Sequence, residues 1–360
     1  MTLSGAPSTM RAVLLTGHGG TERLVPGMVP TPLPGPGEVL VRLGGAAVNN
    51  TDINLRVGWY SKTVTGATDS AGPQAGASSD AGWTGNALTF PRIQGADGAG
   101  RIIGVGEGVS TERIGERVLI DPILRPAGLP LYFGSDVPGA FAEYTTVPEA
   151  NAVQVHSDLT DPELASFPCS YLAALHMVSR AGVRRGQTVV VTGATGGVGT
   201  ALIQWCHARG ARVIAVAETA KHSALQKLGV EATLGRDLSL EQTLGRDSAD
   251  VVLDVVGGNG FPDRLAVLKP HGHYATAGAI AGPLVELDLR TLYLKDLTLH
   301  GCTIPPPTLF AELVKAIETG LIQPLVAMTF DLEDLALAQQ SFLRKDHLGK
   351  IAVRIPAGNQ

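Results

Sequence analysis

Residues 188–210, TVVVTGATGGVGTALIQWCHARG, decide the fold of this chain. The stretch opens on residues 188–192, a short apolar run rich in β-branched side chains, which is typical of a strand buried on both faces of a parallel sheet. A glycine-rich segment follows at once. Apolar residues then recur at helical spacing from Leu202 to Cys206, and Gly210 ends the pattern. The order of strand, glycine turn and helix predicts a βα unit.

The glycine segment inside this unit is a candidate cofactor site. Glycines let the backbone turn tightly and approach a pyrophosphate, whose charge is met by free N–H groups at the start of the helix. A glycine motif alone is weak evidence, but this one has a strand before it, a helix after it and a second strand beyond. We therefore predict a dinucleotide site rather than an ordinary βα turn, formed by Gly193, Ala194, Thr195, Gly196, Gly197, Val198 and Gly199.

Length and composition indicate a globular protein with two domains. The chain has 360 residues, of which 44% are hydrophobic, and a formal net charge of −5. It has no long basic block, no apolar run of about 18 residues and no charged-then-apolar pattern at its N-terminus, so we expect neither nucleic acid nor a membrane as partner. Three widely spaced cysteines indicate a reducing cytoplasm without a disulfide framework: Cys169, Cys206 and Cys302.

The first part of the chain, residues 1–160, is rich in short strand patterns. They lie at residues 11–15, 38–43, 100–105, 117–120 and 140–147, between glycines and prolines. This spacing predicts a partly open β-barrel. Residues 61–89 interrupt it with Ser, Thr, Gly and Ala and almost no apolar periodicity. That insertion is either a flexible surface loop or a lid over a site, with Trp83 as the aromatic side chain that would pack it down.

From residue 161 the pattern changes to alternating helices and strands. An apolar helical stripe covers residues 162–181, and the βα unit follows it. Further strand patterns lie at residues 212–217, 233–234, 249–256, 273–277 and 297–300. This alternation predicts an α/β domain with a doubly wound, six-stranded parallel sheet over residues 161–303. Residues 304–360 contain two helix patterns and a last strand pattern, and we expect them to return to the first domain.

Several motifs in this order are similar to those of a known family. They are AxGGVG at residues 194–199, GADGAGRIIGVGEGV at 95–109, IGERV at 114–118 and VNNTDINLRVGWY at 48–60. Over nearly its full length the chain resembles the medium-chain dehydrogenase/reductase superfamily. Residues 48–60 resemble the zinc-free quinone oxidoreductase and enoyl reductase branch, in which this segment runs from an Asn and an Asp to a tyrosine. The resemblance implies a GroES-like β-barrel domain, a Rossmann cofactor domain and a homodimer built through the cofactor domains.

The resemblance allows zinc binding to be tested by position. Alcohol dehydrogenases of this superfamily hold zinc on a Cys, a His and a further Cys or acid, at places that here carry Asn50, Ala96 and Cys169. One thiol cannot hold a zinc ion, which needs three protein ligands and an open position. Asp97, beside Ala96, does not complete a suitable set. The four-cysteine lobe of those enzymes is absent as well, so we expect no metal.

The choice between NADPH and NADH depends on the end of the strand at residues 212–217. An NAD enzyme places an acid there, about 20 residues after the glycine loop. By the resemblance this place is Ala217, with Glu218 beside it. Lys221 falls where the NADPH quinone reductases carry a lysine for the 2′-phosphate, and Arg236 lies near the next segment.

The attraction of Lys221 and Arg236 for a doubly charged 2′-phosphate outweighs the repulsion from Glu218 if the Glu218 side chain points outward. We therefore expect NADPH rather than NADH. The alternative interpretation is that both cations are solvated surface charges. We also assign three residues that follow the later strands to the cofactor site: Val256, Gly257 and Gly278.

The resemblance and the missing zinc ligands indicate hydride transfer to an activated acceptor. A ketone or alcohol without zinc has no Lewis acid to polarise its oxygen, whereas a quinone or the C=C bond of an enone, enal or enoyl thioester needs less help. We predict that Tyr60 hydrogen-bonds the enolate oxygen or delivers a proton, and that Asn49 and Asp52 orient the site. The alternatives are that Tyr60 is only an aromatic wall and that Asn49 and Asp52 cap a helix.

Two other functions stay open for the sequence alone. One is a zinc-free alcohol or carbonyl oxidoreductase, and the other is a non-catalytic NADPH-binding sensor or scaffold protein. Decay of NADPH absorbance with a quinone, an enone or an enoyl thioester would distinguish an enzyme from a sensor. The expected partner is a small-molecule substrate whose identity the sequence does not give.

Overall fold

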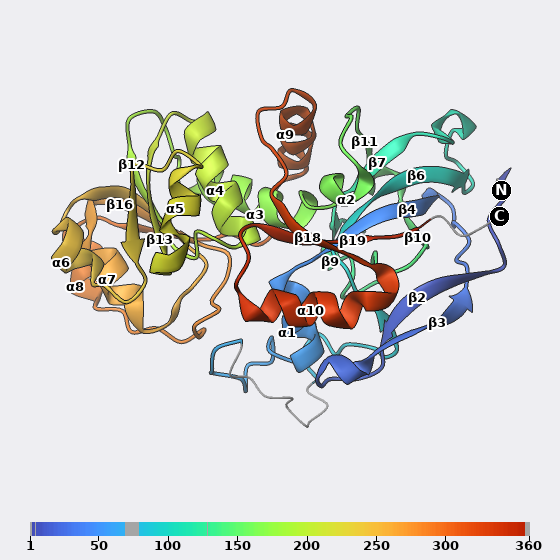
Figure 1. The fold of residues 1–360 in the computed structure, drawn as a ribbon, viewed down its shortest axis with the longest axis horizontal. Helices are drawn as coiled ribbons and strands as arrows, with labels where there is room; N and C mark the ends of the chain where they lie inside the picture. Colours follow the sequence, from blue (N-terminus) through green and yellow to red (C-terminus); the bar gives the residue numbers. More distant parts are fainter. Residues whose placement is uncertain (1, 4, 69–78, 128, 357–360) are drawn as a thin grey trace.

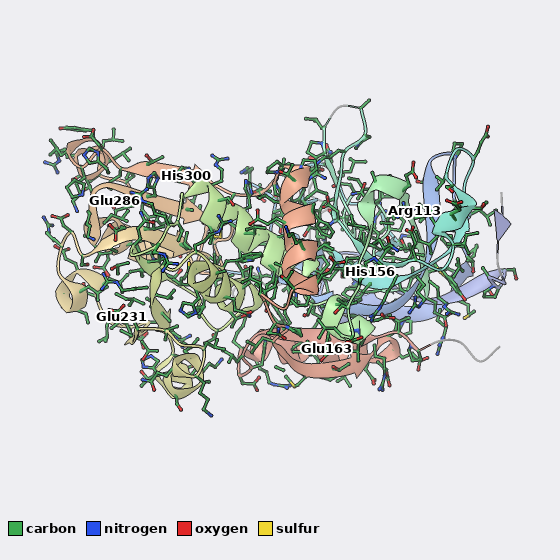
Figure 2. The ribbon with its side chains drawn as sticks, turned by 90° about the horizontal axis from the view of Figure 1, so that it is seen from above. Arg113, His156, Glu163, Glu231, Glu286 and His300 are labelled. Carbon is green, nitrogen blue, oxygen red and sulfur yellow. The ribbon has the colours of Figure 1, made fainter. Side chains whose placement is uncertain are left out.

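The computed structural model describes residues 2–3, 5–68, 79–127 and 129–356. It consists of two parts that lie side by side along the long axis of the molecule (Figure 1). The part on the right of that view holds β-strands from the first half of the chain, and the part on the left holds a parallel sheet with its helices. The view from above in Figure 2 shows the same division, with His300 in the left half and Arg113 in the right half.

A six-stranded parallel sheet forms the second part, in the order β14–β13–β12–β15–β16–β17. The order runs outward in both directions from β12, which is the doubly wound arrangement. The predicted α/β sheet is therefore confirmed. Its strands are β12 (Thr188–Val191), β13 (Arg212–Ala217), β14 (Ala232–Gly235), β15 (Ala249–Asp254), β16 (Leu268–Thr276) and β17 (Thr298–Gly301).

Helices cover both faces of this sheet. Val189 and Val191 of β12 face a core formed with α3, α4 and α9, whereas Val190 faces a second core formed with α6 and α7. This alternation explains why the strand has no polar side chain pointing to water. The helices are α3 (Pro168–Arg180), α4 (Gly197–Ala208), α5 (His222–Gln226), α6 (Leu240–Leu244), α7 (Phe261–Ala266), α8 (Leu289–Leu294) and α9 (Pro307–Glu318).

The β-rich part is built on an eight-stranded sheet. Its main path is β11–β7–β6–β4–β19–β18, with β1 beside β6 and β10 beside β4, and two smaller sheets (β3–β2–β5 and β8–β9) complete it. The strands are β1 (Thr2–Leu3), β2 (Thr9–Leu15), β3 (Leu24–Pro30), β4 (Glu38–Val48), β5 (Arg92–Ile93), β6 (Asp97–Val105), β7 (Arg117–Ile120), β8 (Ile123–Leu124), β9 (Leu131–Tyr132), β10 (Tyr144–Pro148), β11 (Ala152–Gln154), β18 (Val326–Asp331) and β19 (Lys350–Arg354).

The last strands of the chain lie in the sheet of the first strands. β19 pairs antiparallel with β4, and Ile351 is opposite Val48. α10 (Leu335–Arg344) packs on this sheet and runs beneath it beside α1 (Asn50–Val57) in Figure 1. The 3₁₀ helices are η1 (Thr21–Arg23), η2 (Thr111–Arg113), η3 (Glu149–Asn151), η4 (Thr219–Lys221), η5 (Gly258–Gly260) and η6 (Leu332–Asp334).

The apolar stripe at residues 162–181 is not one continuous helix. It forms α2 (Asp161–Leu164) and then α3, which begins at Pro168. Proline has no backbone N–H to continue the hydrogen bonds of α2, but its fixed φ suits the first position of a new helix. Across the described residues, no helix combines the length and the apolar character that a membrane span requires.

Candidate active site

The glycine loop connects β12 to the start of α4. Gly193 has a φ of +58°, a left-handed conformation that glycine adopts without strain. A Cβ atom on Gly199 would overlap the carbonyl oxygen of Gly193, so only glycine lets the helix start this close to the strand. The first turn of α4, from Gly197, leaves backbone N–H groups without helical acceptors, and such groups bind phosphate.

Ala217, Glu218 and Arg236 meet at the carboxyl ends of β13 and β14. Ala217 pairs in register with Gly235, and the backbone N–H of Arg236 donates to the Ala217 carbonyl oxygen at 3.0 Å. The Arg236 guanidinium lies 3.8 Å from the Glu218 carboxylate, and both side chains are more than half exposed. The predicted acid and one of the predicted cations therefore face each other.

Lys221 lies close to these residues, in η4, but its amine points to the C-terminal segment. Its Nζ donates to the carbonyl oxygens of Lys345 and His347, the latter at 3.2 Å. Burial lowers the pKa of Lys221 despite the nearby Glu218 carboxylate. A 2′-phosphate would have to replace these carbonyl oxygens as the acceptor for the lysine.

The remaining predicted cofactor residues lie after β15 and β16. Gly257 has a φ of +63°, and a Cβ there would lie 2.9 Å from the carbonyl oxygen of Gly282. The Val256 N–H donates to the Asp254 carboxylate at 2.8 Å, and Gly278 follows β16. Both segments leave the sheet at the carboxyl edge that also carries the glycine loop, and ligands of open α/β sheets bind at this edge.

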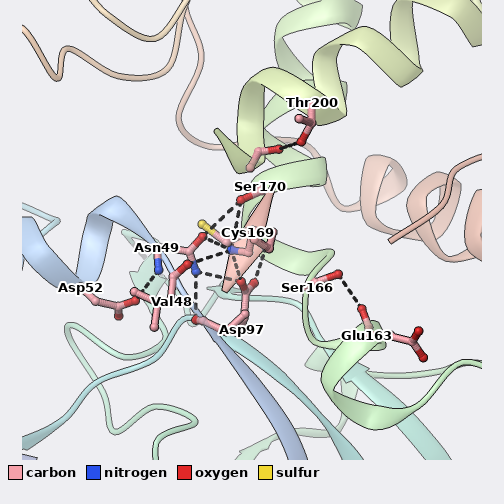
Figure 3. Close-up of polar contacts among 12 residues, drawn as sticks. Val48, Asn49, Asp52, Asp97, Glu163, Ser166, Cys169, Ser170 and Thr200 are labelled. Carbon is pink, nitrogen blue, oxygen red and sulfur yellow. Dashed lines mark hydrogen bonds and ion pairs between the residues drawn. The ribbon is translucent and has the colours of Figure 1, made fainter. Parts of the chain in front are cut away.

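A buried polar cluster lies next to the glycine loop, between the two parts of the chain (Figure 3). Its centre is the Lys350 ammonium group, whose Nζ is 2.5 Å from Asn49 Oδ1, 2.8 Å from Asp97 Oδ2 and 3.2 Å from both Ser170 Oγ and the Val48 carbonyl oxygen. Lys350 is 1% exposed and Asp97 is fully buried. We call these five residues the lysine cluster.

The carboxylate of Asp97 is fully engaged within this cluster. Its Oδ2 accepts from Lys350 and from the Asn49 side-chain amide at 2.8 Å, and its Oδ1 accepts from the backbone N–H of Cys169 at 2.6 Å. The thiol of Cys169 is close by, and burial raises its pKa to about 12. The thiol therefore stays protonated at neutral pH.

Asn49 and Asp52 have different roles in the structure. Asn49 precedes α1 as its N-cap residue, and its side chain points into the lysine cluster. Asp52 accepts from the Asn49 backbone N–H at 2.8 Å, which is a helix-capping bond. Burial raises the pKa of Asp52 to about 7. Helix capping, the alternative interpretation, therefore describes Asp52 well, whereas the Asn49 side chain also binds Asp97 and Lys350.

Of the two asparagines at the start of α1, only one reaches Asp97. The side chain beside Asp97 belongs to Asn49, whereas Asn50 donates to the side chains of Asn54 at 3.2 Å and of Thr68 at 3.5 Å. The reason is that Asn49 has an extended backbone, and the helical turn that begins at Asn50 rotates the next side chain away.

Tyr60 is half-buried beyond the end of α1. Its hydroxyl bonds to the side chains of Thr51 and Asn54, and burial raises its pKa to about 12. The Cys169 thiol and the Asp52 carboxylate are near enough to act on it electrostatically. The structure therefore brings Tyr60, Asp52 and the edge of the lysine cluster into one neighbourhood.

The sequence prediction missed Lys350 and Tyr132. The Tyr132 hydroxyl lies 3.2 Å from the Cys169 sulfur, and Trp83 stacks on the Tyr132 ring with centroids 4.4 Å apart. One signal was available for Lys350, because a lysine at the start of the apolar strand KIAV needs a partner if it is buried. Tyr132 carries no comparable signal in the sequence.

The described ends of the 61–89 insertion contact both parts of the molecule. Trp83 donates its backbone N–H to Ser135 at 3.1 Å, beside the Tyr132 stacking contact. The Thr68 N–H donates to the carbonyl oxygen of Ile280 at 3.0 Å, in the segment that follows β16. Residues 69–78 of the predicted insertion lie outside the described residues. Within the described ranges, no group of three or more His, Cys, Asp or Glu side chains is placed to hold a metal ion.

Comparisons with known proteins agree with this architecture. The family model of the alcohol dehydrogenase GroES-like domain matches residues 35–157, and that of the zinc-binding dehydrogenase matches residues 197–319. A candidate alcohol dehydrogenase from Sinorhizobium meliloti 1021 has a crystal structure that superposes with a TM-score of 0.88, at 45% identity over 98% of both chains. The GroES-like barrel and the Rossmann cofactor domain expected from the sequence are confirmed.

Two relatives are named as a reductase and an oxidoreductase. Acryloyl-coenzyme A reductase of Metallosphaera sedula is 27% identical, over 95% of this chain and 99% of the relative. Quinone oxidoreductase of Lama guanicoe is 26% identical, over 92% of this chain and 93% of the relative. With the fold and the match at 45% identity, they show that this chain is a nicotinamide-dependent oxidoreductase of the medium-chain dehydrogenase/reductase superfamily, in its quinone and enoyl reductase-like branch.

Proposed function

We propose that this protein is an NADPH-dependent, zinc-independent reductase. It transfers a hydride to an activated acceptor, either a quinone or the C=C bond of an enone, enal or enoyl thioester. The single observation that carries this proposal is the lysine cluster. Next to the glycine loop, the ammonium group of Lys350 binds the polar side chains that a metal ion would otherwise need as ligands. The names of the acryloyl-coenzyme A reductase and quinone oxidoreductase relatives supply the substrate classes.

The donor groups of this site do not suit zinc. Zinc in proteins takes thiolate, imidazole and carboxylate ligands, usually three in a catalytic site. The Cys169 thiol has a pKa of about 12, both Asp97 oxygens are already bound, and Ala96 supplies no donor atom. The Lys350 ammonium group already binds Asn49 Oδ1 and Asp97 Oδ2, the oxygen atoms that a metal ion in this position would need as ligands. No step of the proposed reaction therefore passes through a metal.

The residues around the glycine loop suit a dinucleotide. Gly193 to Gly196 form the tight turn, and the first turn of α4, from Gly197, would present N–H groups to a pyrophosphate. Lys221 and Arg236 would hold a 2′-phosphate at the ends of β13 and β14, against the single acid Glu218. When bound, NADPH would supply the hydride.

Tyr60 stabilises the charge that develops on the acceptor. Its pKa of about 12 keeps the hydroxyl protonated at neutral pH, so it is a hydrogen-bond donor for an enolate or quinol oxygen. Thr51 and Asn54 hold this hydroxyl in place. An acceptor that spreads charge onto a carbonyl oxygen needs only such a donor, whereas a simple alcohol or ketone would need stronger polarisation.

A substrate panel tests this proposal. The rate of NADPH oxidation is measured with a quinone, an enone, an enal and an enoyl-coenzyme A thioester, at metal contents established by elemental analysis. We expect turnover with at least one of these acceptors, unchanged after dialysis against a chelator. Oxidation of alcohols as the only activity, or loss of turnover with removal of zinc, would contradict the proposal.

We also propose a homodimer through the edge of the parallel sheet. Among the strands that the structure describes, β17 has a single neighbour, β16. Large apolar side chains are exposed along β17 and in the segment before it, and an exposed apolar patch beside an unpaired edge is typical of an interface. They are Leu284, Val285, Leu289, Tyr293, Leu294 and Leu299.

A further inference from the structure

The position of the Lys350 side chain is fixed at its charged end. Three groups from separate elements bind its ammonium: Asn49 at the end of β4, Asp97 of β6 and Ser170 of α3. A buried carboxylate and ammonium that lose their partner are costly, so this geometry has little freedom. The ammonium group is therefore anchored to the β-rich part of the molecule and to α3.

The stem of the same side chain packs against the glycine loop. A Cβ added to Gly197 would lie 2.5 Å from Lys350 Cδ and 2.8 Å from Ser170 Oγ, so the loop backbone and the lysine leave no room for a methyl group. Protein interiors are closely packed, and such a contact transmits a displacement of either partner. Lys350 thus contacts the loop with its stem and the lysine cluster with its charge.

The backbone beside Lys350 is also bonded to the loop. The Gly349 N–H donates to the carbonyl oxygen of Thr195 at 2.8 Å, and Gly349 forms a β-bridge with Gly196. Gly349, the residue before β19, therefore lies alongside the glycine loop, while β19 itself pairs with β4. The two parts of the chain are joined at the point where a pyrophosphate would bind.

We propose that Lys350 is a positioning residue for nucleotide binding, a role that rests on the proposed reductase function. It holds the backbone of residues 195–197 in the conformation that presents N–H groups to the pyrophosphate, and it fixes this loop relative to the side chains around Tyr60. Lys350 does not touch the reacting atoms. Its loss changes the affinity for the nucleotide because the loop is no longer held.

The experiment uses the double variant K350M/D97N. Methionine keeps most of the stem, and removing both charges together avoids a buried unpaired carboxylate. Nucleotide affinity is measured by NADPH fluorescence, which does not depend on activity, and the melting temperature is recorded for each protein. K227M is the matched control, because Lys227 is an exposed lysine outside the site.

We expect K350M/D97N to weaken NADPH binding about tenfold or more, which corresponds to ~1.4 kcal/mol, while K227M binds as the unmodified protein does. NADPH affinity of K350M/D97N equal to that of the unmodified protein would overturn the inference and leave the proposed function standing. If the unmodified protein binds neither NADPH nor NADH, the proposed function fails, and this inference fails with it.

G197A gives a second route that keeps both charges. The added methyl group displaces the lysine stem, so we again expect about tenfold weaker NADPH binding. In the triple variant G197A/K350M/D97N, the added methyl group contacts the more flexible methionine at position 350. The loss of NADPH affinity in this variant should therefore be clearly smaller than the product of the losses in G197A and in K350M/D97N. A loss of NADPH affinity in the triple variant equal to the product of the two separate losses would overturn the inference. If K350M/D97N does not fold, an unchanged NADPH affinity of G197A would overturn it.

Discussion

At the scale of single residues, Tyr60 is the side chain on which the proposed chemistry depends. Its hydroxyl is held by Thr51 and Asn54 and is protonated at neutral pH, because its pKa is about 12. A hydroxyl that is both oriented and protonated stabilises a developing oxyanion without reorganising first. Phenylalanine would keep the ring and its packing and would remove only this donor.

We therefore expect Tyr60→Phe to lower turnover about 10²-fold with the best acceptor, while the Kd for NADPH stays within about twofold. Steady-state kinetics and fluorescence titration measure the two quantities separately. Tyr144→Phe is the matched control, since Tyr144 lies in β10, outside the proposed site and the proposed dimer interface. Full turnover by Tyr60→Phe would mean that Tyr60 is an aromatic wall.

Asp52 makes folding stability depend on pH. Burial raises its pKa to about 7 in the folded protein, above the ordinary value of 3.8. Between these values the folded state keeps a proton that the unfolded state has lost, so the free energy of unfolding falls as pH rises from about 4 to about 7. The contribution is fully present below the lower value and lost above the higher one.

The Asp52→Asn variant should remove this dependence, because asparagine cannot ionise and still accepts the capping bond from Asn49. The free energy of unfolding is measured with denaturant at pH 5 and at pH 8. We expect the unmodified protein to lose more stability between the two values than Asp52→Asn does, by a few kcal/mol at most. Asp158→Asn, at an exposed position, serves as the control. Equal losses in all three proteins would contradict the assignment.

At the scale of elements, the ends of β13 and β14 decide between the two nucleotides. Lys221 and Arg236 carry the positive charge there, and Glu218 carries the negative charge. A charge-assisted bond to a phosphate is stronger than a bond to a carbonyl oxygen, so a 2′-phosphate should displace Lys221 from the Lys345 and His347 carbonyl groups.

Lys221→Ala should therefore weaken NADPH binding about tenfold or more and change NADH binding little. Titration of each variant with both nucleotides gives the two dissociation constants. The Lys227→Ala variant, at an exposed position nearby in the sequence, controls for general charge effects. Equal losses for NADPH and NADH would remove Lys221 from the 2′-phosphate site.

The elements that the sequence predicts well are those with local signals. The glycine turn with its flanking strand and helix, and the strand at residues 212–217, follow from periodicity alone. The end of one helix and the start of the next at Pro168 is also a local signal, but the continuous apolar pattern of residues 162–181 suggested a single helix. Lys350 differs, because its partners Asn49, Asp97 and Ser170 are between 180 and 301 residues away. Contacts of that separation depend on how the sheets pair, which no pattern in a single strand specifies.

At the scale of the whole molecule, the unpaired edge of the parallel sheet is the feature that calls for a partner. β17 lies at one edge of the sheet, and Figure 2 shows His300 of this strand in the half of the molecule away from Arg113. A second copy, related by a two-fold axis, can pair its own β17 antiparallel with the first and bury Leu294 and Leu299, which are 72% and 37% exposed.

The variant Leu299→Lys tests this dimer. At a two-fold interface one substitution introduces two lysines on facing strands, and their repulsion and desolvation oppose association. We expect the unmodified protein to have twice the mass of one chain in light scattering, and Leu299→Lys to shift toward a single chain with its fold intact by circular dichroism. Leu33→Lys, at an exposed leucine of the β-rich part, should remain dimeric. A dimer that tolerates Leu299→Lys would move the interface away from β17, and a monomeric unmodified protein would exclude it.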